Sequence, residues 1–324
     1  MAPLDRRQFL KRGLLVLGAL TSAGAVADLL AGQRPVTTMR RTPGLERPPL
    51  SAATTPTPVP TVAPIEAPAA LPSAPSMAEA ARWPVPTPGI QPPAGFGLRV
   101  PVLMYHRVVE PTHAGDSLPG LVVPPPLFAA QLELLHAVGW RTCTAARLAE
   151  ALQHGHPLPP RTFVITLDDG WSDGATQALP ILQRFGYSAT YYVIGGRIGR
   201  PGFLGAADLE ALVAAGMEIG DHTLDHLALP RLDPVRQRYE IAAASARIAQ
   251  VVGQAPVTFS YPSGRFSPAV EDALAQLGFG LAVTTTPGTG AAWSERFVVP
   301  RQRVTPSMSP TSLLAQLELG HLGL

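Results

Sequence analysis

Cysteine is almost absent from this chain of 324 residues, and charged residues are scarce. The single cysteine, Cys143, excludes an internal disulfide, and we interpret it as a small buried apolar residue. Only 15% of the residues are charged, and from Leu98 onward 16 Lys and Arg stand against 18 Asp and Glu. Because binding to nucleic-acid phosphates needs a basic face, this balance argues against nucleic acid as a partner.

A long apolar run is also missing, although the N-terminus carries a short one. The stretch Asp5-Arg6-Arg7-Gln8-Phe9-Leu10-Lys11 contains a twin arginine, an apolar run follows from Leu14 to Leu20, and Ala25-Val26-Ala27 has the small-x-small pattern of a signal-peptidase site. The run is shorter than the ~20 residues of a membrane span. We interpret residues 1–32 as a twin-arginine (Tat-type) signal peptide, with an uncleaved N-terminal anchor as the alternative. In both cases we expect an exported protein (periplasmic, cell-surface or secreted), with membrane contact only through a retained N-terminus.

Residues 33–97 lack the apolar and aromatic content of a folded domain. They contain 16 of the 37 prolines, and Trp83 and Phe96 are their aromatic residues. Such a segment cannot bury enough surface to fold, and its prolines favour extended conformations. The sequence therefore predicts a disordered linker rich in Pro, Thr and Ala over 33–97, followed by a functional domain over 98–324.

Strand-like and helix-like segments alternate after Leu98. Apolar and β-branched runs predict strands at 100–105, 163–167, 189–193, 217–220, 257–261, 281–284 and 297–304. Helical patterns that stop before a glycine predict helices at 127–138, 208–215, 234–252 and 268–277. This alternation predicts an α/β fold with a parallel sheet or barrel, in which active sites collect at the carboxyl ends of the strands.

Two adjacent acids end one of these predicted strands. The run from Thr162 to Leu167 is followed by Asp168, Asp169 and Gly170. Neighbouring strand residues point to opposite sides, so the two carboxylates can share a site only where the strand becomes a loop, and we expect Gly170 to make that break. Two buried acids need a metal ion or a shared proton to neutralise them. The alternative is an ordinary solvated Asp-Gly turn.

Two histidines follow another predicted strand, in the run His222-Thr223-Leu224-Asp225-His226. Histidines four residues apart share one face if the chain enters a helix there, so that both imidazoles can reach one ion. With Asp169 they make a set of two imidazoles and one carboxylate, which in hydrolytic zinc sites leaves positions open for water. The same set also suits non-haem iron, so the ligands alone do not determine the metal.

A third pattern, Phe259-Ser260-Tyr261-Pro262-Ser263-Gly264, follows the strand predicted before it and by itself is compatible with a simple Pro-Gly turn. Together the three patterns resemble the motifs of the polysaccharide deacetylases with a NodB-type domain, carbohydrate esterase family four. Thr166 to Gly170 matches the family's Thr-Phe-Asp-Asp-Gly motif with Leu in place of Phe, and His222 to His226 matches its His-Ser/Thr-x-x-His motif. Residues 101–108, 281–288 and 300–304 resemble the subgroup that acts on poly-N-acetylglucosamine.

The resemblance implies a distorted (β/α)7-type barrel and a metal-dependent N-deacetylase. It implies that Asp169, His222 and His226 hold one divalent ion, with Zn²⁺ as the first choice and Co²⁺, Ni²⁺ or Fe²⁺ as alternatives. The ion would lower the pKa of a bound water toward about 7. The implied partner is an N-acetylated polysaccharide, either an exopolysaccharide or a cell-wall glycan.

The resemblance also implies roles around the ion and shows one departure from the family. Asp168 would be the general base, the backbone N–H of Tyr261 would stabilise the oxyanion, and Pro262 would hold that loop rigid. The family's acid, a histidine of a Leu-x-x-x-His-type motif, is not recognisable. His106, at the end of the first predicted strand, is the candidate acid or substrate-binding group, with a structural role as the alternative. Arg301 is a candidate to orient Asp168, with a surface salt bridge as the alternative.

Several functions are compatible with these residues. An N-deacetylase is favoured, and an O-acetyl esterase on xylan or a peptidoglycan deacetylase would use the same site. The missing acid motif also permits a carbohydrate-binding protein with a degenerate site. A membrane-tethered structural protein with an incidental metal is the least favoured, because stability alone would not require the second carboxylate, Asp168.

Overall fold

A computed structural model describes residues 92–115 and 117–322 of the chain. The predicted signal peptide, residues 1–32, and the predicted linker up to residue 91 lie outside the described residues. The last residues assigned to the linker are part of the fold. Strand β1 (Gly97–Leu98) pairs antiparallel with β11 (Ala291–Ala292), and Phe96 packs against buried apolar residues. The folded domain therefore begins before Leu98, because Phe96 and Gly97 have partners far along the chain that composition does not reveal.

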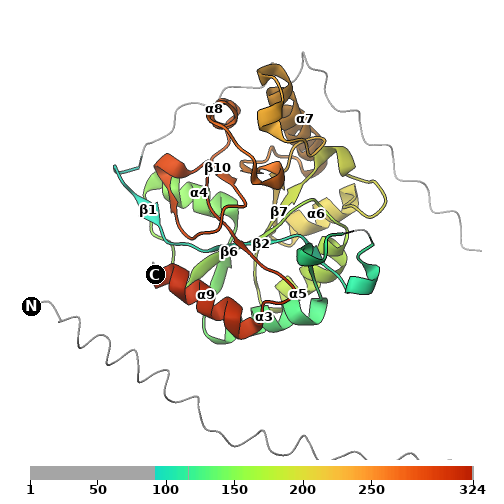
Figure 1. The fold of residues 1–324 in the computed structure, drawn as a ribbon, viewed down its shortest axis with the longest axis vertical. Helices are drawn as coiled ribbons and strands as arrows, with labels where there is room; N and C mark the ends of the chain where they lie inside the picture. Colours follow the sequence, from blue (N-terminus) through green and yellow to red (C-terminus); the bar gives the residue numbers. More distant parts are fainter. Residues whose placement is uncertain (1–91, 116, 323–324) are drawn as a thin grey trace, which may run out of the picture. The chain divides into compact units, whose positions relative to one another are not determined.

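An eight-stranded parallel sheet lies at the centre of the domain (Figure 1). Its strands are β2 (Val102–Tyr105), β5 (Arg141–Cys143), β6 (Thr162–Leu167), β7 (Thr190–Val193), β8 (Glu218–Asp221), β9 (Thr258–Ser260), β10 (Leu281–Val283) and β12 (Gln302–Arg303). The order is β10-β9-β8-β7-β6-β2-β12, and β5 pairs with β6. The segment from Val299 to Arg303 pairs with β10 at its start and with β2 at its end. The sheet is therefore curled and barrel-like, as the sequence predicts.

Helices cover the outside of this sheet (Figure 1). They are α3 (Pro125–Ala137), α4 (Ala145–His154), α5 (Leu179–Arg184), α6 (Ala206–Ala214), α7 (Pro234–Val252), α8 (Pro268–Gln276) and α9 (Pro310–Leu322). A π-helical turn, η3 (Gly174–Ala178), precedes α5, and a small parallel pair joins β3 (Arg107–Val108) to β4 (Val122–Val123). Within the residues that the structure describes, none of the helices is both long and apolar enough to cross a membrane.

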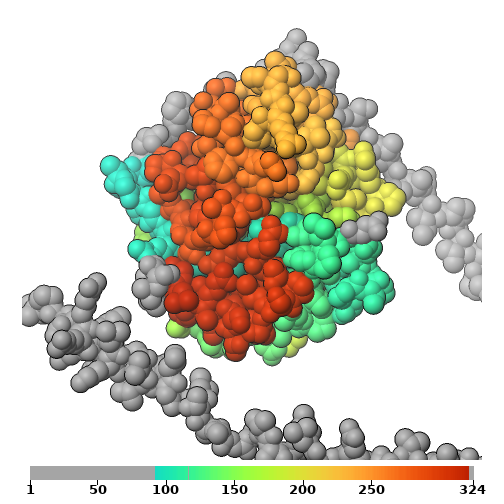
Figure 2. Space-filling view, in the orientation of Figure 1, coloured from blue at the N-terminus to red at the C-terminus, as the bar shows by residue number. Residues whose placement is uncertain are grey.

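Segments far apart in the sequence meet on one face of the domain. Helix α9 packs against α3, and the Gln131 side chain on α3 donates to the Met308 carbonyl at 2.8 Å. Figure 2 accordingly shows the red C-terminal part of the chain beside the teal and green residues that follow position 100. This packing joins the last helix to the first part of the domain.

Local sequence accounts well for the helix ends that were predicted. The Asp233 side chain accepts from the N–H groups of Val235 and Arg236 at the start of α7, and Gly253 ends the helix with a φ of 78°. The α7 bounds match the prediction, and α3, α6 and α8 differ from theirs by one or two residues. Helices α4, α5 and α9 were not predicted. Strand β12 is shorter than expected, because residues before it pair with β10 and not with β2.

Strand alternation separates an apolar outer face from a more polar inner face. On β6, Phe163 and Ile165 belong to the apolar cluster beneath the helices, whereas Thr166 contacts the buried side chain of Arg301. On β9, Phe259 packs with the aliphatic residues of α8, whereas the next residue, Ser260, also contacts Arg301. The carboxyl ends of these strands therefore direct polar groups into the curl of the sheet.

The inner face leaves no room for a side chain at Gly220 on β8. A Cβ atom there would lie 2.5 Å from two ring atoms of Tyr192, which is fully buried. We expect Gly220→Ala to lower the free energy of unfolding by about 1–3 kcal/mol through overpacking, as measured by urea denaturation. Gly120→Ala is the control, because its added Cβ meets nothing within 4 Å, and it should change stability by less than about 0.5 kcal/mol. Equal stability of the two variants would contradict this packing.

Candidate functional site

The candidate site is a pocket at the carboxyl edge of the parallel sheet, where the loops that follow several strands meet. Its volume is roughly 310 Å³. The lining residues are His106, Leu118, Leu121, Asp168, Asp169, His222, His226, Tyr261, Ser263, Thr285 and Arg303. The pocket thus brings together all the predicted metal ligands, the predicted base and the candidate acid. Pro262 and Arg301 are not among its lining residues, and both are buried.

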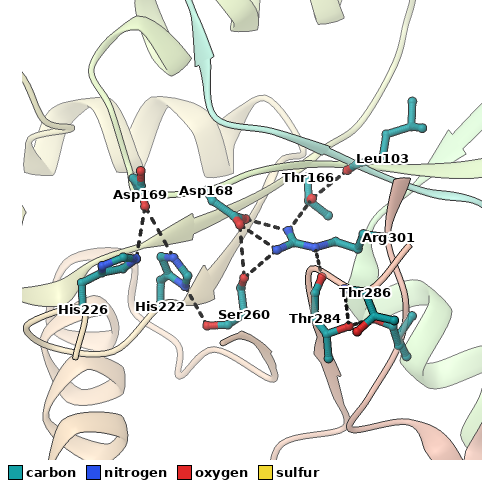
Figure 3. Close-up of polar contacts among 11 residues, drawn as sticks. Leu103, Thr166, Asp168, Asp169, His222, His226, Ser260, Thr284, Thr286 and Arg301 are labelled. Carbon is teal, nitrogen blue, oxygen red and sulfur yellow. Dashed lines mark hydrogen bonds and ion pairs between the residues drawn. The ribbon is translucent and has the colours of Figure 1, made fainter. Parts of the chain in front are cut away.

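Asp169, His222 and His226 form the one cluster of potential metal ligands found among the described residues. The Oδ1 atom of Asp169 lies 3.5 Å from Nε2 of His222 and 3.6 Å from Nε2 of His226 (Figure 3). The two imidazole rings have their centroids 4.8 Å apart. One carboxylate oxygen and two ring nitrogens therefore face a common point.

These three atoms fit a tetrahedral divalent ion. Ligands about 2.1 Å from a zinc ion are about 3.4 Å apart at the tetrahedral angle, close to the separations between Asp169 and the two histidines. The other ring nitrogen of His222, Nδ1, lies 2.6 Å from the Ser260 carbonyl. Because a carbonyl can only accept, Nδ1 carries the proton, and Nε2 keeps the lone pair that a metal needs. The donor set thus suits the ion that the sequence predicts, without identifying its element.

Left-handed backbone at non-glycine residues brings the ligands together. The strand breaks at Asp169 itself, with φ of 77°, and Gly170 continues the bend with φ of 74°. This turns Asp169 toward the side that Asp168 already faces. The chain does not enter a helix at the histidine corner, so helical spacing does not place the two histidines on one face: Thr223 and His226 have φ of 64° and 59°. The two histidines therefore converge through a strained loop and not through helical periodicity.

Helix α7 supports the strained histidine loop. The backbone carbonyl of Glu240 accepts from the Leu224 N–H at 2.9 Å, and its carboxylate accepts from the Asp225 N–H at 2.9 Å. The Ser245 hydroxyl donates to the Asp221 carboxylate at 2.6 Å, just before the loop. Burial raises the pKa of Asp221 to about 7, although this hydroxyl and a backbone N–H oppose the shift. The loop conformation is thus determined by contacts with a helix that follows it.

Asp168 lies beside this cluster in a buried ion pair with Arg301 (Figure 3). The guanidinium binds the carboxylate in a bidentate manner, with Nη1 2.8 Å from Oδ1 and Nη2 2.7 Å from Oδ2. Its remaining donors reach Thr166 Oγ1, Ser260 Oγ and the Thr284 carbonyl. Burial alone would raise the pKa of Asp168, but Arg301 outweighs it and holds that pKa below its ordinary value. Because Arg301 is fully buried, the alternative of a surface salt bridge is wrong.

His106 lies in the same pocket, outside the ligand set. Burial lowers its pKa below the ordinary value, although the carboxylates of Asp168 and Asp169 oppose that shift. The neutral imidazole is therefore the favoured form near pH 7. In this form His106 can hydrogen-bond to a bound group, and it can donate a catalytic proton only after taking one up.

Tyr261 lines the pocket, but its predicted oxyanion role does not match the geometry. Its backbone N–H donates to the Val283 carbonyl at 3.2 Å, so it is engaged in the pairing of β9 with β10. The physical reason is that residue 261 still continues the strand register, and its N–H points toward β10. Pro262 begins a short 3₁₀ turn, η6 (Pro262–Gly264), closed by a hydrogen bond from Gly264 N–H to the Tyr261 carbonyl at 2.8 Å. Pro262 thus shapes this loop without lining the pocket.

The site also includes residues that were not predicted to belong to it. Leu118 and Leu121 come from the loop after β3, Thr285 follows β10, and Arg303 lies on β12. Ser260 contacts both His222 and Arg301. The place of Ser260 inside the third sequence pattern is a signal that could have found it. Thr285 and Arg303 lie in the stretches 281–288 and 300–304 that resemble the subgroup, so these patterns could have pointed to them. Leu118 and Leu121 have no such pattern, because only tertiary packing brings them to the pocket.

Comparison with known proteins identifies the family. A family model described as polysaccharide deacetylase matches residues 155–282, which include the cluster and Asp168 but neither His106 nor Arg301. The chain is 31% identical over 220 residues to the Bacillus subtilis protein YxkH, named as a candidate polysaccharide deacetylase, and the match covers 68% of this chain and 76% of YxkH. The chain belongs to the polysaccharide deacetylase family. This confirms the resemblance that the three sequence motifs indicated. Members of this family are hydrolases.

The chain is also similar to a solved deacetylase structure and, over a short segment, to a poly-N-acetylglucosamine deacetylase. The Streptococcus pyogenes deacetylase PplD, solved in complex with acetate, superposes with a TM-score of 0.63 at 28% identity, covering 68% of this chain and 98% of that one. A segment of 71 residues is 34% identical to the poly-β-1,6-N-acetyl-D-glucosamine N-deacetylase of Escherichia coli K12. That match covers 22% of this chain and only 11% of the relative.

Replacing Arg301 tests how much the Asp168–Arg301 pair stabilises the metal-free protein. Arg301→Met leaves a buried carboxylate without its partner, so we expect the free energy of unfolding at pH 7 to fall by about 3–5 kcal/mol. The pKa of Asp168 is lower in the folded state, so the stabilisation is present above about pH 4 and is lost as the pH falls through the folded-state pKa. The deficit of the variant should therefore shrink in acid.

Denaturant unfolding of the double variant Asp168→Asn, Arg301→Met is the matched control. It removes both charges of the pair, so it should recover most of the stability that the single variant loses. An Arg301→Met protein as stable as the wild type at pH 7 would contradict the importance of the pair.

Proposed function

We propose that this protein is an exported, metal-dependent polysaccharide N-deacetylase, which hydrolyses the acetamide groups of N-acetylglucosamine residues in an exopolysaccharide or a cell-wall glycan. One observation carries the proposal: a cluster of one carboxylate and two imidazoles lies in the same pocket as a second carboxylate, Asp168, which is paired with Arg301. Membership of the polysaccharide deacetylase family supports the reaction type. The twin-arginine pattern at the N-terminus supports export, to the compartment where such glycans occur.

Asp169, His222 and His226 would hold the ion. A bound divalent ion would supply Lewis-acid polarisation of the acetyl carbonyl and a water of lowered pKa. Zn²⁺ suits the two imidazoles and the carboxylate, and Co²⁺, Ni²⁺ and Fe²⁺ are alternatives that the same donors accept. His222 is prepared for this role, because the Ser260 carbonyl holds its proton on the other ring nitrogen.

Asp168 would act as the general base. Arg301 keeps its carboxylate ionised and fixes its orientation, so the group is available to accept a proton from water. Attack of water on the acetamide carbon and cleavage of the carbon–nitrogen bond give acetate and a glucosamine amine. The leaving nitrogen needs a proton, and the proton that Asp168 accepts from water balances this requirement.

His106 would contact the substrate in the same pocket. Its favoured neutral form supports a hydrogen bond to the glycan or to the acetamide more than immediate proton donation. The backbone N–H of Tyr261 is occupied by Val283, so we assign it no part in stabilising the oxyanion. Leu118 and Leu121 add apolar surface to the wall, which suits the methyl group of an acetamide or a face of a sugar ring.

Asp169→Asn tests the metal and the reaction together. The amide is a poorer ligand than the carboxylate, so we expect the variant to lose nearly all of its bound metal and its release of acetate from N-acetylated oligosaccharides. Metal content is measured by elemental analysis and acetate by an enzymatic assay. Asp272→Asn is the control, because Asp272 is an exposed residue of α8 and the same change there should alter neither quantity. Full activity of Asp169→Asn would refute the assignment.

A panel of substrates tests the glycan. We expect acetate release from β-1,6-linked N-acetylglucosamine oligomers, which the name of the Escherichia coli relative supports, and compare it with chitooligosaccharides, peptidoglycan and acetylxylan. Faster release from acetylxylan would identify an O-acetyl esterase. Release from peptidoglycan alone would identify a cell-wall enzyme. Binding to a glycan without turnover in metal-loaded protein would favour the carbohydrate-binding alternative, which the missing acid motif supports.

A further inference from the structure

Trp171 contacts Asp169 through the carboxylate oxygen that does not face the two histidines. Its indole N–H donates to Oδ2 of Asp169 at 3.1 Å. The other oxygen of the same carboxylate, Oδ1, faces His222 at 3.5 Å and His226 at 3.6 Å. The two oxygens therefore have separate partners, and only Oδ1 is directed to the point where the two imidazoles converge.

The indole itself is held between a ring and a cation. The Phe203 ring stacks on it with centroids 4.5 Å apart and planes at 24°. The guanidinium of Arg107 lies 4.4 Å from the indole centroid, and that of Arg197 lies 5.0 Å from the Phe203 centroid. We call these four residues, Arg107, Trp171, Phe203 and Arg197, the indole stack. Contacts of this kind contribute about 0.5–2 kcal/mol each, so together they restrict the motion of the indole.

Backbone contacts and one ion pair anchor the indole stack. Trp171 and Phe203 form an antiparallel β-bridge, and the Leu204 N–H donates to the Gly170 carbonyl at 2.9 Å. On the other side, Arg107 pairs with the buried Asp173 at 2.7 Å. The indole N–H is thus aimed at Asp169 by residues of three separate segments, around 107, 171–173 and 203.

This arrangement does not suit a sugar-binding platform. An aromatic residue that stacks on a pyranose presents a free face, whereas the indole of Trp171 is covered by Phe203 and by Arg107. What the indole offers instead is its one polar atom, Nε1, and that atom is already directed at a predicted metal ligand. The terminal torsion of an aspartate is broad, so a carboxylate without such a contact samples many orientations.

We propose that Trp171 is a positioning residue that selects one orientation of the Asp169 carboxylate, so that a single oxygen is presented to the ion. The inference rests on the proposed function, because it requires a metal at the cluster. Contacts that orient metal ligands typically contribute 10–100-fold to metal affinity, so the same scale applies here. The indole stack holds the donor in place.

The test compares Trp171→Phe with the wild type, using Zn²⁺ and Co²⁺ alone as probes on the full chain. Phenylalanine keeps an aromatic ring in the stack but removes the N–H. Competition with a chromophoric chelator should show roughly 10–100-fold weaker Zn²⁺ binding. The visible absorption of the Co²⁺ form should change, because the carboxylate is no longer held with one oxygen toward the ion. Trp293→Phe is the matched control, since Trp293 is not among the pocket residues, and it should bind both ions like the wild type.

The outcomes separate the two proposals. Trp171→Phe protein that is folded and binds Zn²⁺ with wild-type affinity overturns the positioning role, whatever its stability. If Trp171→Phe does not yield folded protein, Phe203→Leu decides, because it keeps the N–H but loosens the stack. The Phe203→Leu variant should bind Zn²⁺ severalfold more weakly than the wild type, and an unchanged Zn²⁺ affinity overturns the proposal. Wild-type protein that binds neither ion overturns the proposed function and this inference with it.

Discussion

The buried ion pair of Asp168 and Arg301 is the contact around which the site is organised. Removing two charges from water is costly, and the cost is offset only when every donor and acceptor finds a partner. Arg301 satisfies this condition: besides Asp168 it contacts Thr166, Ser260 and the Thr284 carbonyl. These groups lie on β6, on β9 and just after β10, while Arg301 itself precedes β12. One guanidinium therefore connects the carboxyl ends of strands from opposite edges of the curled sheet.

Two adjacent aspartates acquire different environments through this arrangement. Asp168 keeps the alternation of β6 and points to the inner face, where a permanent cation neutralises it. Asp169 adopts a left-handed backbone and turns to the histidines instead. Carboxylates placed in different surroundings can take different chemical roles, one as a base and the other as a ligand. The difference arises from backbone conformation and neighbours, because the two side chains are identical.

Each part of the predicted metal cluster also depends on residues outside it. The Ser260 carbonyl determines the tautomer of His222, helix α7 holds the loop that carries both histidines, and Trp171 contacts the far oxygen of Asp169. Left-handed conformations at Thr223 and His226 are costly on their own and persist where surrounding contacts enforce them. Asp169 also has a left-handed backbone, and Trp171 of the indole stack contacts its carboxylate from outside the cluster. Preorganisation of this kind is what allows three side chains to converge before any ligand binds.

Local patterns by themselves determined a large part of this protein. Alternating strand and helix signals predicted the parallel α/β domain, and the acids after β6, the histidines after β8 and the turn after β9 predicted the site, because carboxyl ends of parallel strands share one edge. Tertiary structure alone decided the rest. For Arg301, the sequence left an orienting role and a surface salt bridge open, and the structure decided for Asp168, 133 residues away. Phe203 meets Trp171 through a bridge between loops. The histidine corner is a loop braced by α7, and the Tyr261 N–H is taken by β10. Such contacts depend on strand register and on the closing of the sheet, which no short stretch of sequence encodes.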